Sequence, residues 1–459
     1  MTIYYIFGNI IIVIIWINNA CNRTKVVNVF WEKGIETIDT GELKELQLDR
    51  LKTILIRAKS TPYYSQLFKD IGFNPLDFES LDGIKRLPFT GKDELRKHYP
   101  YGFLAVPRDE IVRMHSSSGT TGRPIVVFHT MRDVGNWANL VARSMYMAGA
   151  RKSDVFQNTM GYGLFTGGLG FHYGAEKIGM MVIPSGPGNS PRQITLMREF
   201  DTTAIHILPS YALHLLDIFE ELKLDPRKDV KLRMAFIGAE PHSEEMRKKI
   251  EESYDINAFN SYGLSEMNGP GVAFECPEKD GLHVWEDSFY TEIIDRQTLE
   301  PLPDGQEGEI VFTTLNREGM PLIRYRTKDL AYIYPDPCPC GRTHRRISRI
   351  KGRNDDMLII KGVNMFPIQI ETVLMKFPEI GRNYQIILET KEHLDELIIE
   401  VEVLSPADDM RIYERLRGKI AEALRDEILV NPKINLVQPG TIKKAEGKAV
   451  RVVDKREKS

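Results

Sequence analysis

Short apolar runs alternate with amphipathic segments through the middle of this chain. The runs Met180–Pro184, Thr203–Pro209 and Leu232–Glu240 are rich in apolar residues, as buried strands are. The stretches SPRQITLMREF and SEEMRKKIEESY have the pattern of surface helices, and each begins with a serine that predicts an N-terminal cap. Since such alternation is typical of parallel strands joined by helices, we expect an α/β fold with a doubly wound sheet.

The flanking regions predict further elements. A leucine repeat over 42–58 and the stretch after Pro62 predict two helices, and Ile111–Phe128 has the pattern of strand, loop and strand. Beyond Gly281 the pattern favours an antiparallel β region. From Asp355 onward it follows the order β-α-β-β-α-β, which predicts a small α+β domain.

These patterns divide the chain into three parts. Residues 1–28 form an apolar leader, residues 29–353 a large domain with doubly wound sheets and a β subdomain, and residues 354–459 a small C-terminal domain. The polar, glycine-containing stretch Lys351–Asp356 is the expected hinge between the two domains.

Composition limits the partners that the chain is expected to have. A net charge of −3 gives no reason to expect nucleic acid or an anionic membrane as the main partner. Four cysteines in 459 residues are too few for a disulfide framework, which favours a reducing compartment such as the cytoplasm. A homodimer is compatible with the sequence.

The leader is strongly apolar over Ile3–Ile17, and no Lys or Arg precedes it. It is short for a membrane span, which needs roughly 20 apolar residues. Three interpretations stay open: an extension upstream of the folded protein, an N-terminal membrane anchor, and a signal peptide. Arg23 and Lys25 follow it, so an anchor would leave the body of the chain cytoplasmic. A membrane is therefore a partner only if the leader is retained.

The stretch HSSSGTTGRP, His115–Pro124, has almost nothing to bury. It is not a Walker A loop, because no Lys-Ser/Thr pair follows its second glycine. It offers backbone N–H groups made accessible by Gly119 and Gly122, and hydroxyls that can surround a polyphosphate. The alternative interpretation is a plain flexible linker. The hydroxyl residues are Ser116, Ser117, Ser118, Thr120 and Thr121.

Three charged residues stand in short polar motifs further along the chain. Glu266 lies in SYGLSEMNG, Asp329 ends the polar part of RYRTKDL, and Lys448 lies in GTIKKAEGKAVRV. A carboxylate at Asp329 is suited to bind two ribose hydroxyls. Taken singly, each residue is also compatible with an ordinary solvated surface position, and Asp329 with a surface Arg–Asp pair.

Cys276, His283, Cys338 and Cys340 form a candidate metal set. Proline and glycine in DPCPCGRTH predict a tight turn, and thiolate and imidazole ligands suit tetrahedral zinc. Four protein ligands would leave no open position, so the zinc would be structural. Free buried thiols and a disulfide remain alternatives, and His344 is an alternative to His283.

Together and in this order, the motifs resemble those of the adenylate-forming superfamily of acyl-CoA synthetases, and most of all its phenylacetate–CoA ligase branch. The resemblance covers about Val29 to Arg456, so the leader lies outside it. The motifs that carry it are SSSGTTGRP, GYGLFTGGLGFHYGAEKIG, GAEP, YGLSE, RYRTKDL, GRNDDMLIIKGVNMFPIQIE and EGKAVRV.

The resemblance implies ATP-dependent ligation of an aryl acid, phenylacetate or a related arylacetate, to coenzyme A through an acyl-adenylate, with release of AMP and pyrophosphate. It places the β- and γ-phosphates on Ser116–Gly122 and Mg²⁺ on Glu266. It gives Lys448 the bridge between the substrate carboxylate and the α-phosphate, a task suited to a point charge on a flexible stem. Lys443 and Lys444 lie close by, so this assignment rests on the EGK context.

The resemblance also assigns the rest of the nucleotide site. Asp329 would bind the ribose hydroxyls with help from Arg353, and Tyr262 would stack on the adenine. The residues expected around the adenine are Gly238, Ala239, Glu240, Tyr262 and Gly263. The superfamily often has glycine where this chain has Lys328, although the phenylacetate branch tolerates a basic residue there.

The acyl pocket and the hinge follow in the same way. Met160, Tyr162, Phe165 and Gly168 would line the acyl pocket, where the branch commonly has tyrosine in place of Met160. Methionine packs against irregular and aromatic shapes, so an arylacetate still fits. The small domain would be mobile about Asp355, and Lys361 and Gly362 would approach coenzyme A.

Two other functions remain alternatives. One is an adenylyltransferase of the same branch that stops at the nucleotidyl product and is indifferent to coenzyme A. The other is a nucleotide-binding regulatory protein without catalysis, against which the presence of Glu266, Asp329 and Lys448 argues.

Overall fold

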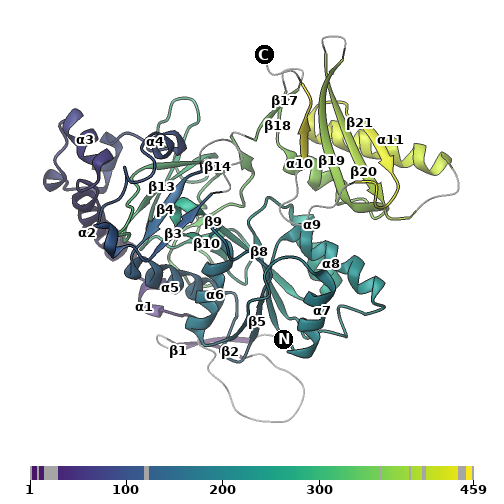
Figure 1. Cartoon of the computed structure of the whole chain (residues 1–459), viewed down its shortest axis with the longest axis horizontal. Helices are drawn as coiled ribbons and strands as arrows, with labels where there is room; N and C mark the ends of the chain where they lie inside the picture. The colour runs from purple at the N-terminus through teal and green to yellow at the C-terminus, as the bar shows by residue number, and fades with distance from the viewer. Residues whose placement is uncertain are drawn as a thin grey trace.

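The computed structural model describes residues 3–7, 10–14, 29–117, 124–354, 356–360, 363–391, 394–405, 410–442 and 451–456. A large body carries the first three quarters of the chain, and a smaller lobe at its upper right in Figure 1 carries the last hundred residues or so. Helices cover sheets in both, so the predicted α/β fold is confirmed.

An eight-stranded sheet forms the centre of the large body. Its strand order is β15-β11-β10-β9-β8-β7-β5-β6. The elements of its parallel half are β5 (Val155–Asn158), α6 (Gly167–Ile178), β6 (Met181–Ile183), α7 (Ser190–Glu199), β7 (Ala204–Ile207), α8 (Pro209–Glu221), β8 (Met234–Gly238), α9 (Glu244–Tyr254) and β9 (Asn257–Leu264). Strands β5 to β9 pair in parallel, as the sequence predicts.

The other half of this sheet is antiparallel. Its strands β11 and β15 lie in the antiparallel region predicted beyond Gly281, whereas β10 and the joining of these strands to the parallel sheet are not predicted. It consists of β10 (Gly269–Glu275), β11 (Leu282–Val284) and β15 (Arg346–Ile347), each paired antiparallel with its neighbour. The tight connection of only a few residues between β9 and β10 forces this reversal, because a parallel partner needs a long crossover.

The helix caps agree with the sequence at one predicted position and differ at the other. The Ser243 side chain accepts the N–H of Met246 at 3.1 Å and caps α9, as predicted. The predicted cap at Ser190 is wrong, because Ser190 is already the first residue of α7. Asn189 is the cap instead, and its side chain accepts the N–H of Arg192 at 3.3 Å.

The remaining elements of the large body surround the central sheet. A four-stranded antiparallel sheet runs in the order β12-β13-β14-β16. The elements are α1 (Lys33–Glu36), α2 (Thr40–Ala58), α3 (Pro62–Asp70), η1 (Pro75–Asp77), η2 (Leu81–Arg86), α4 (Lys92–Lys97), η3 (Arg108–Glu110), β3 (Arg113–Ser116), β4 (Val126–His129), α5 (Met131–Met147), η4 (Ser265–Met267), β12 (Phe289–Ile294), β13 (Gly308–Thr314), β14 (Tyr325–Ala331) and β16 (Gly352–Arg353). The predicted strand–loop–strand is the β3–β4 pair.

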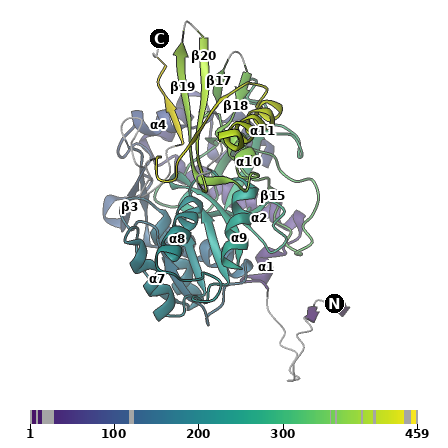
Figure 2. The same ribbon diagram turned by 90° about the vertical axis from the view of Figure 1, so that its right-hand side faces the viewer.

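The small lobe has its own hydrophobic core, built from both of its helices and its sheet. The sheet runs in the order β21-β20-β19-β22, and Figure 2 shows it beside α10 and α11. The elements are β17 (Leu358–Ile360), β18 (Val363–Met365), α10 (Pro367–Leu374), β19 (Ile380–Lys391), β20 (Leu394–Val403), α11 (Met410–Ile428), β21 (Lys433–Val437) and β22 (Val452–Asp454). The sequence pattern predicts all of these except β18 and β22.

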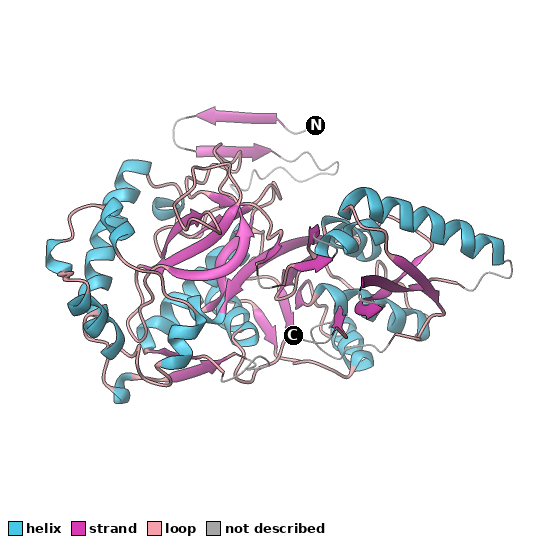
Figure 3. Cartoon of the chain, turned by 90° about the horizontal axis from the view of Figure 1, so that it is seen from above, coloured by secondary structure: helices cyan, strands magenta, loops and turns pink. Residues whose placement is uncertain are grey.

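Two strands stand in the leader, β1 (Ile3–Phe7) and β2 (Ile10–Ile14), which pair antiparallel. Figure 3 shows them outside the large body. Within the part of the chain that the structure describes, no helix combines the length and the apolar character that crossing a membrane requires.

Candidate functional site

Two strands of different sheets, β9 and β14, exchange hydrogen bonds between tyrosines and carboxylates. The hydroxyl of Tyr262 on β9 donates to Asp329 Oδ2 on β14 at 2.6 Å. In return, the hydroxyl of Tyr325 on β14 donates to Oε1 of Glu266, which follows β9, at 2.7 Å. All four side chains are buried. Asp329 on β14 is thus held by a tyrosine of β9, and Glu266, just after β9, is held by a tyrosine of β14.

Burial and the adjacent carboxylates raise the pKa of both tyrosines well above the usual value, so both remain protonated donors. Asp329 has a further partner, because Arg353 on the neighbouring strand β16 donates Nη1 to its Oδ1 at 2.9 Å. The predicted association of Asp329 with Arg353 is therefore seen in the geometry. Lys328 adopts a left-handed φ of 69°, the conformation that a glycine takes most easily at this position.

Arg317 brings a buried cation to Glu266. Its Nη1 donates to the backbone carbonyl of Glu266, and its side chain is fully buried. Burial lowers the pKa of Arg317 to about 10 against the opposing effect of Asp133 and Glu266, so it remains charged at neutral pH. Its Nε and Nη2 have no hydrogen-bond partner within the described part of the chain. Such unused donors favour an additional anion at this position.

The end of β8 approaches β9 very closely at the predicted adenine residues. A Cβ on Gly238 would lie 2.4 Å from the carbonyl oxygen of Ser261, so only glycine fits. Ala239 follows with a left-handed φ of 63°. Glu240 Oε1 accepts the N–H of Ser210 at 2.7 Å. These residues lie at the carboxyl ends of parallel strands, where α/β sheets bind their ligands.

Three of the four predicted acyl-pocket residues meet around Asn158. Its Nδ2 donates to the Tyr162 hydroxyl at 2.9 Å and to the Gly168 carbonyl at 2.7 Å, and its Oδ1 accepts the N–H of Met160 at 3.3 Å. Burial raises the pKa of Tyr162 to about 12. Phe165 differs from the other three, because it is 44% exposed.

Only part of the predicted phosphate loop lies within the described residues. The N–H of Ser116 donates to Leu164 O at 2.9 Å, and Ser117 Oγ accepts the N–H of Ile125 at 3.0 Å. The start of the loop therefore lies beside Leu164, next to the predicted acyl-pocket residue Phe165, and is hydrogen-bonded to Ile125, which precedes β4. The predicted residues outside the described ranges are Ser118, Gly119, Thr120, Thr121, Gly122, Asp355, Lys361, Gly362 and Lys448.

Three functional candidates were missed by the sequence analysis: Tyr325, Arg317 and Asn158. Tyr325 lies in the motif RYRTKDL, in which only Asp329 was assigned a role from the sequence. Asn158 ends the largely buried strand β5, which the sequence analysis did not predict, and a polar residue at such a strand end is a usable signal. Arg317 lies in a loop without a recognisable pattern.

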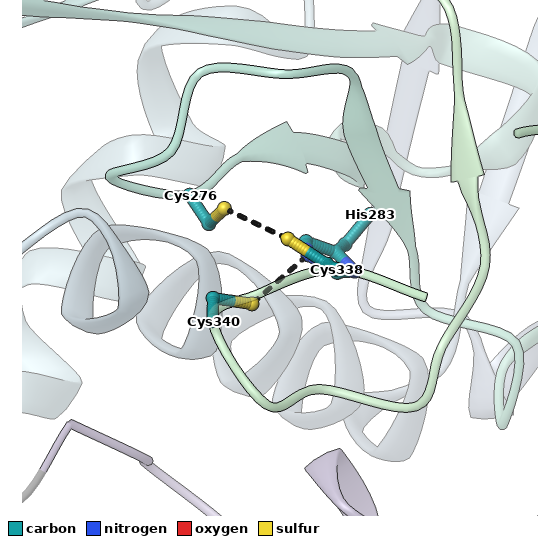
Figure 4. A group of neighbouring side chains, drawn as sticks. All are labelled: Cys276, His283, Cys338 and Cys340. Atoms are coloured by element: carbon teal, nitrogen blue, oxygen red, sulfur yellow. Dashed lines mark hydrogen bonds between the residues drawn. The ribbon is translucent and has the colours of Figure 1, made fainter. Parts of the chain in front are cut away.

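Cys276, His283, Cys338 and Cys340 converge on one point (Figure 4). Their ligand atoms all lie within 4.8 Å of one another. Cys276 Sγ lies 3.7 Å from Cys338 Sγ, and Cys340 Sγ lies 3.2 Å from His283 Nε2. His283 donates its Nδ1 proton to the backbone carbonyl of His344 at 2.8 Å, which leaves the Nε2 lone pair directed at the thiols.

The same geometry decides two of the alternatives. The three cysteines of the cluster are free, so the disulfide interpretation is wrong for them. His344 is also excluded as a ligand. Its Nδ1 accepts the N–H of Glu286 at 2.9 Å and its Nε2 donates to the carbonyl of Ile35 at 2.9 Å, which leaves neither nitrogen for a metal.

Family models match both parts of the chain. Residues 74–316 match the model of the AMP-binding enzymes, and residues 362–456 match that of the AMP-binding enzyme C-terminal domain. A phenylacetate-coenzyme A ligase from Pseudomonas putida is 46% identical over 426 residues, which cover 92% of this chain and 96% of the relative. The chain belongs to the AMP-binding enzyme family, in the branch of the phenylacetate-coenzyme A ligases.

Solved structures of a 2-hydroxyisobutyryl-CoA ligase separate two arrangements of the lobes. In its post-adenylation state that ligase matches this chain with a TM-score of 0.88 at 29% identity. In its thioesterification state, with coenzyme A, the TM-score is 0.70 at 31% identity. Both comparisons cover 97% of this chain and 96% of the ligase. The described lobes of this chain are therefore arranged as in the post-adenylation state.

Proposed function

We propose that this chain ligates phenylacetate or a related arylacetate to coenzyme A through an acyl-adenylate, with release of AMP and pyrophosphate. The observation that carries the proposal is the crossed pair of tyrosine-held carboxylates, Asp329 and Glu266. The extended similarity to phenylacetate-coenzyme A ligases supports the choice of acid and of the acceptor.

In this proposal the crossed pair binds opposite ends of the nucleotide. Asp329, with its orientation fixed by Tyr262 and Arg353, accepts the two ribose hydroxyls. The turn Gly238–Glu240 with Gly263 lies along the adenine, and the missing Cβ of Gly238 lets this turn pack against Ser261 of β9. The hydroxyl loop from Ser116 to Gly122 binds the phosphates.

Glu266 fits a magnesium ion by its donor chemistry. Tyr325 occupies only Oε1, and no hydrogen bond to Oε2 is made within the described part of the chain, so one hard carboxylate oxygen is available. A Mg²⁺ ion held there would supply positive charge to the phosphate oxygens. The unused Nε and Nη2 of Arg317 supply further positive charge beside it.

The small lobe supplies the remaining groups. Lys448 bridges the substrate carboxylate and the α-phosphate during adenylation. We place the boundary between the large domain, 29–353, and the small domain, 354–459, at a hinge centred on Asp355. Rotation there withdraws Lys448 and brings Lys361 and Gly362 to coenzyme A.

The acyl pocket of the proposal is lined by Met160, Tyr162, Phe165 and Gly168. Tyr162 is the one polar side chain of these four, and its hydroxyl accepts from Asn158 and lies 3.2 Å from His172 Nδ1. Such a largely apolar set favours an unsubstituted aromatic ring over a hydroxylated one.

The cysteine–histidine cluster fits a structural Zn²⁺. Three thiols and one imidazole complete a tetrahedral set with no open position. The loop that carries Cys338 and Cys340 continues to Arg342, which donates to Glu36 Oε2 at 2.8 Å. The zinc therefore organises the loop that fastens α1 to the large body.

A panel of acids tests the proposed reaction against an adenylyltransferase that stops at a nucleotidyl product. Pyrophosphate release and thioester formation are measured for phenylacetate, 4-hydroxyphenylacetate, benzoate and acetate, with and without coenzyme A. We expect phenylacetate to give phenylacetyl-CoA at the highest kcat/KM. Pyrophosphate release in which no acid of the panel is consumed and coenzyme A has no effect would overturn the proposal.

A further inference from the structure

One carboxylate joins the two lobes at the adenine side of the site. Glu371 on α10 of the small lobe is only 3% exposed. Its Oε1 accepts the backbone N–H of Ser243 at 2.8 Å, and Ser243 caps α9 of the large body. The start of a helix favours a negative charge, so this position suits a carboxylate. Ser243 also lies close to the adenine turn, because it is three residues beyond Glu240, the last residue of that turn.

The second oxygen of Glu371 binds a residue of β19, the strand that pairs with β22, and β22 follows Lys448 in the chain. Its Oε2 accepts the Tyr384 hydroxyl at 2.8 Å. The guanidinium of Arg451 lies over the Tyr384 ring, 4.3 Å from its centroid, and Ile386 N donates to Arg451 O at 2.7 Å. Arg451 is three residues beyond Lys448. A series of contacts therefore runs from Ser243, just after the adenine turn, through Glu371 and Tyr384 to Arg451.

The contact is suited to break and reform. Burying a carboxylate costs free energy, and burial raises the pKa of Glu371 even though Ser243, Arg451 and Tyr384 oppose this shift. Two hydrogen bonds offset only part of that cost. The contact also belongs to the arrangement shared with the post-adenylation state, whereas the same ligase in its thioesterification state matches this chain less well.

We propose that Glu371 is a positioning residue for adenylation, which holds the small lobe and its Lys448 segment against the adenine turn and releases them for thioester formation. This inference rests on the proposed two-step function. It predicts that the residue matters in the first half-reaction and not in the second.

The test separates the two half-reactions in the full-length protein. Phenylacetate-dependent exchange between pyrophosphate and ATP measures adenylation, and phenylacetyl-adenylate supplied with coenzyme A measures thioester formation. Glu371→Ala is expected to lower the exchange rate roughly tenfold, the loss typical of one hydrogen bond to a charged group. Thioester formation from the supplied adenylate is expected to stay within about twofold of the wild type or to rise.

Two further variants keep the test decisive. Tyr384→Phe removes only the hydroxyl, and a smaller loss confined to adenylation is expected even if Glu371→Ala does not fold. Ile434→Val removes one buried methylene from β21, at the opposite edge of the sheet and two strands away from β19, and is expected to leave both half-reactions unchanged.

The outcomes distinguish this inference from the function on which it rests. Equal losses in both half-reactions of a folded Glu371→Ala protein, or unchanged adenylation, would overturn the role of Glu371. A wild type that forms no phenylacetyl-adenylate would instead overturn the proposed function.

Discussion

Replacing Tyr262 by phenylalanine removes the hydroxyl that binds Asp329 at 2.6 Å and keeps the buried ring in place. Hydrogen bonds to charged groups contribute about 1.5–3 kcal/mol. Because Arg353 still holds Oδ1 of Asp329 at 2.9 Å, we expect the lower end of that range. About 1.5 kcal/mol corresponds to roughly a tenfold rise in KM for ATP, since 1.4 kcal/mol is a factor of ten.

The matched change is Tyr325→Phe, which removes the 2.7 Å hydrogen bond to Glu266. No Arg or Lys side chain forms a salt bridge with Glu266 among the described residues, so the loss should reach the upper end of the same range. If Glu266 holds the metal, this loss raises the Mg²⁺ concentration for half-maximal rate by on the order of a hundredfold. KM for ATP at saturating Mg²⁺ should change little.

The assay is the initial rate of thioester formation over a grid of ATP and Mg²⁺ concentrations, for the wild type, both single variants and the double variant. Thermal unfolding of each protein controls for loss of folding. We expect two separate shifts: Tyr262→Phe raises KM for ATP, and Tyr325→Phe raises the Mg²⁺ concentration for half-maximal rate. Variants that both shift the same constant, or that shift neither while remaining folded, would refute the assignment of the two carboxylates to different ends of the nucleotide.

Three other predictions follow from the site and its surroundings. Lys448→Ala should lower adenylation by orders of magnitude and leave thioester formation from supplied phenylacetyl-adenylate nearly intact; equal losses would contradict its role. Elemental analysis should find one zinc per chain, and Cys338→Ser should remove it and lower the unfolding temperature, whereas a metal-free wild type would exclude the site. Burial would raise the pKa of Asp287, but Arg143, with Nη1 2.8 Å from Oδ1, lowers it to about 2, below the usual value for an aspartate. The ionised carboxylate therefore stabilises the fold by about 2 kcal/mol above pH 4, and the unfolding free-energy difference between wild type and Asp287→Asn should shrink as pH falls from 4 toward 2.

The sequence predicts the parallel half of the large sheet well, because each strand and helix there has its own local pattern. The antiparallel region beyond Gly281 is predicted, but the joining of its strands β11 and β15 to the parallel sheet is not, for a physical reason. Strand β11 has three residues and β15 two, and they pair across about sixty residues of chain, so their pairing depends on tertiary contacts. The predicted cap of α7 is wrong for a similar reason. Asn189 has a left-handed backbone conformation and its side chain accepts the N–H of Arg192, so Asn189 is the cap and Ser190 is the first residue of the helix.

The candidate site shows the same division between local and tertiary signals. Motifs identify Asp329 and Glu266, since each stands in a short recognisable stretch. Their tyrosine partners come from each other's strands, and no local pattern encodes an exchange between two sheets. The choice of His283 over His344 is also tertiary, because it depends on which nitrogen of each ring is already used by a backbone group.

The crossed pair of carboxylates, Asp329 and Glu266, bears on what changes in the site when the small lobe moves. Asp329 and Glu266 are fixed by partners within the large body, except that Arg353 lies two residues before the proposed hinge at Asp355. A rotation at the proposed hinge would therefore leave Tyr262 on Asp329 and Tyr325 on Glu266, whereas the Glu371 contact with Ser243, which joins the two lobes, would open. Nucleotide binding and lobe position are thus assigned to different carboxylates, which allows the acyl-adenylate to stay bound while the lysine departs.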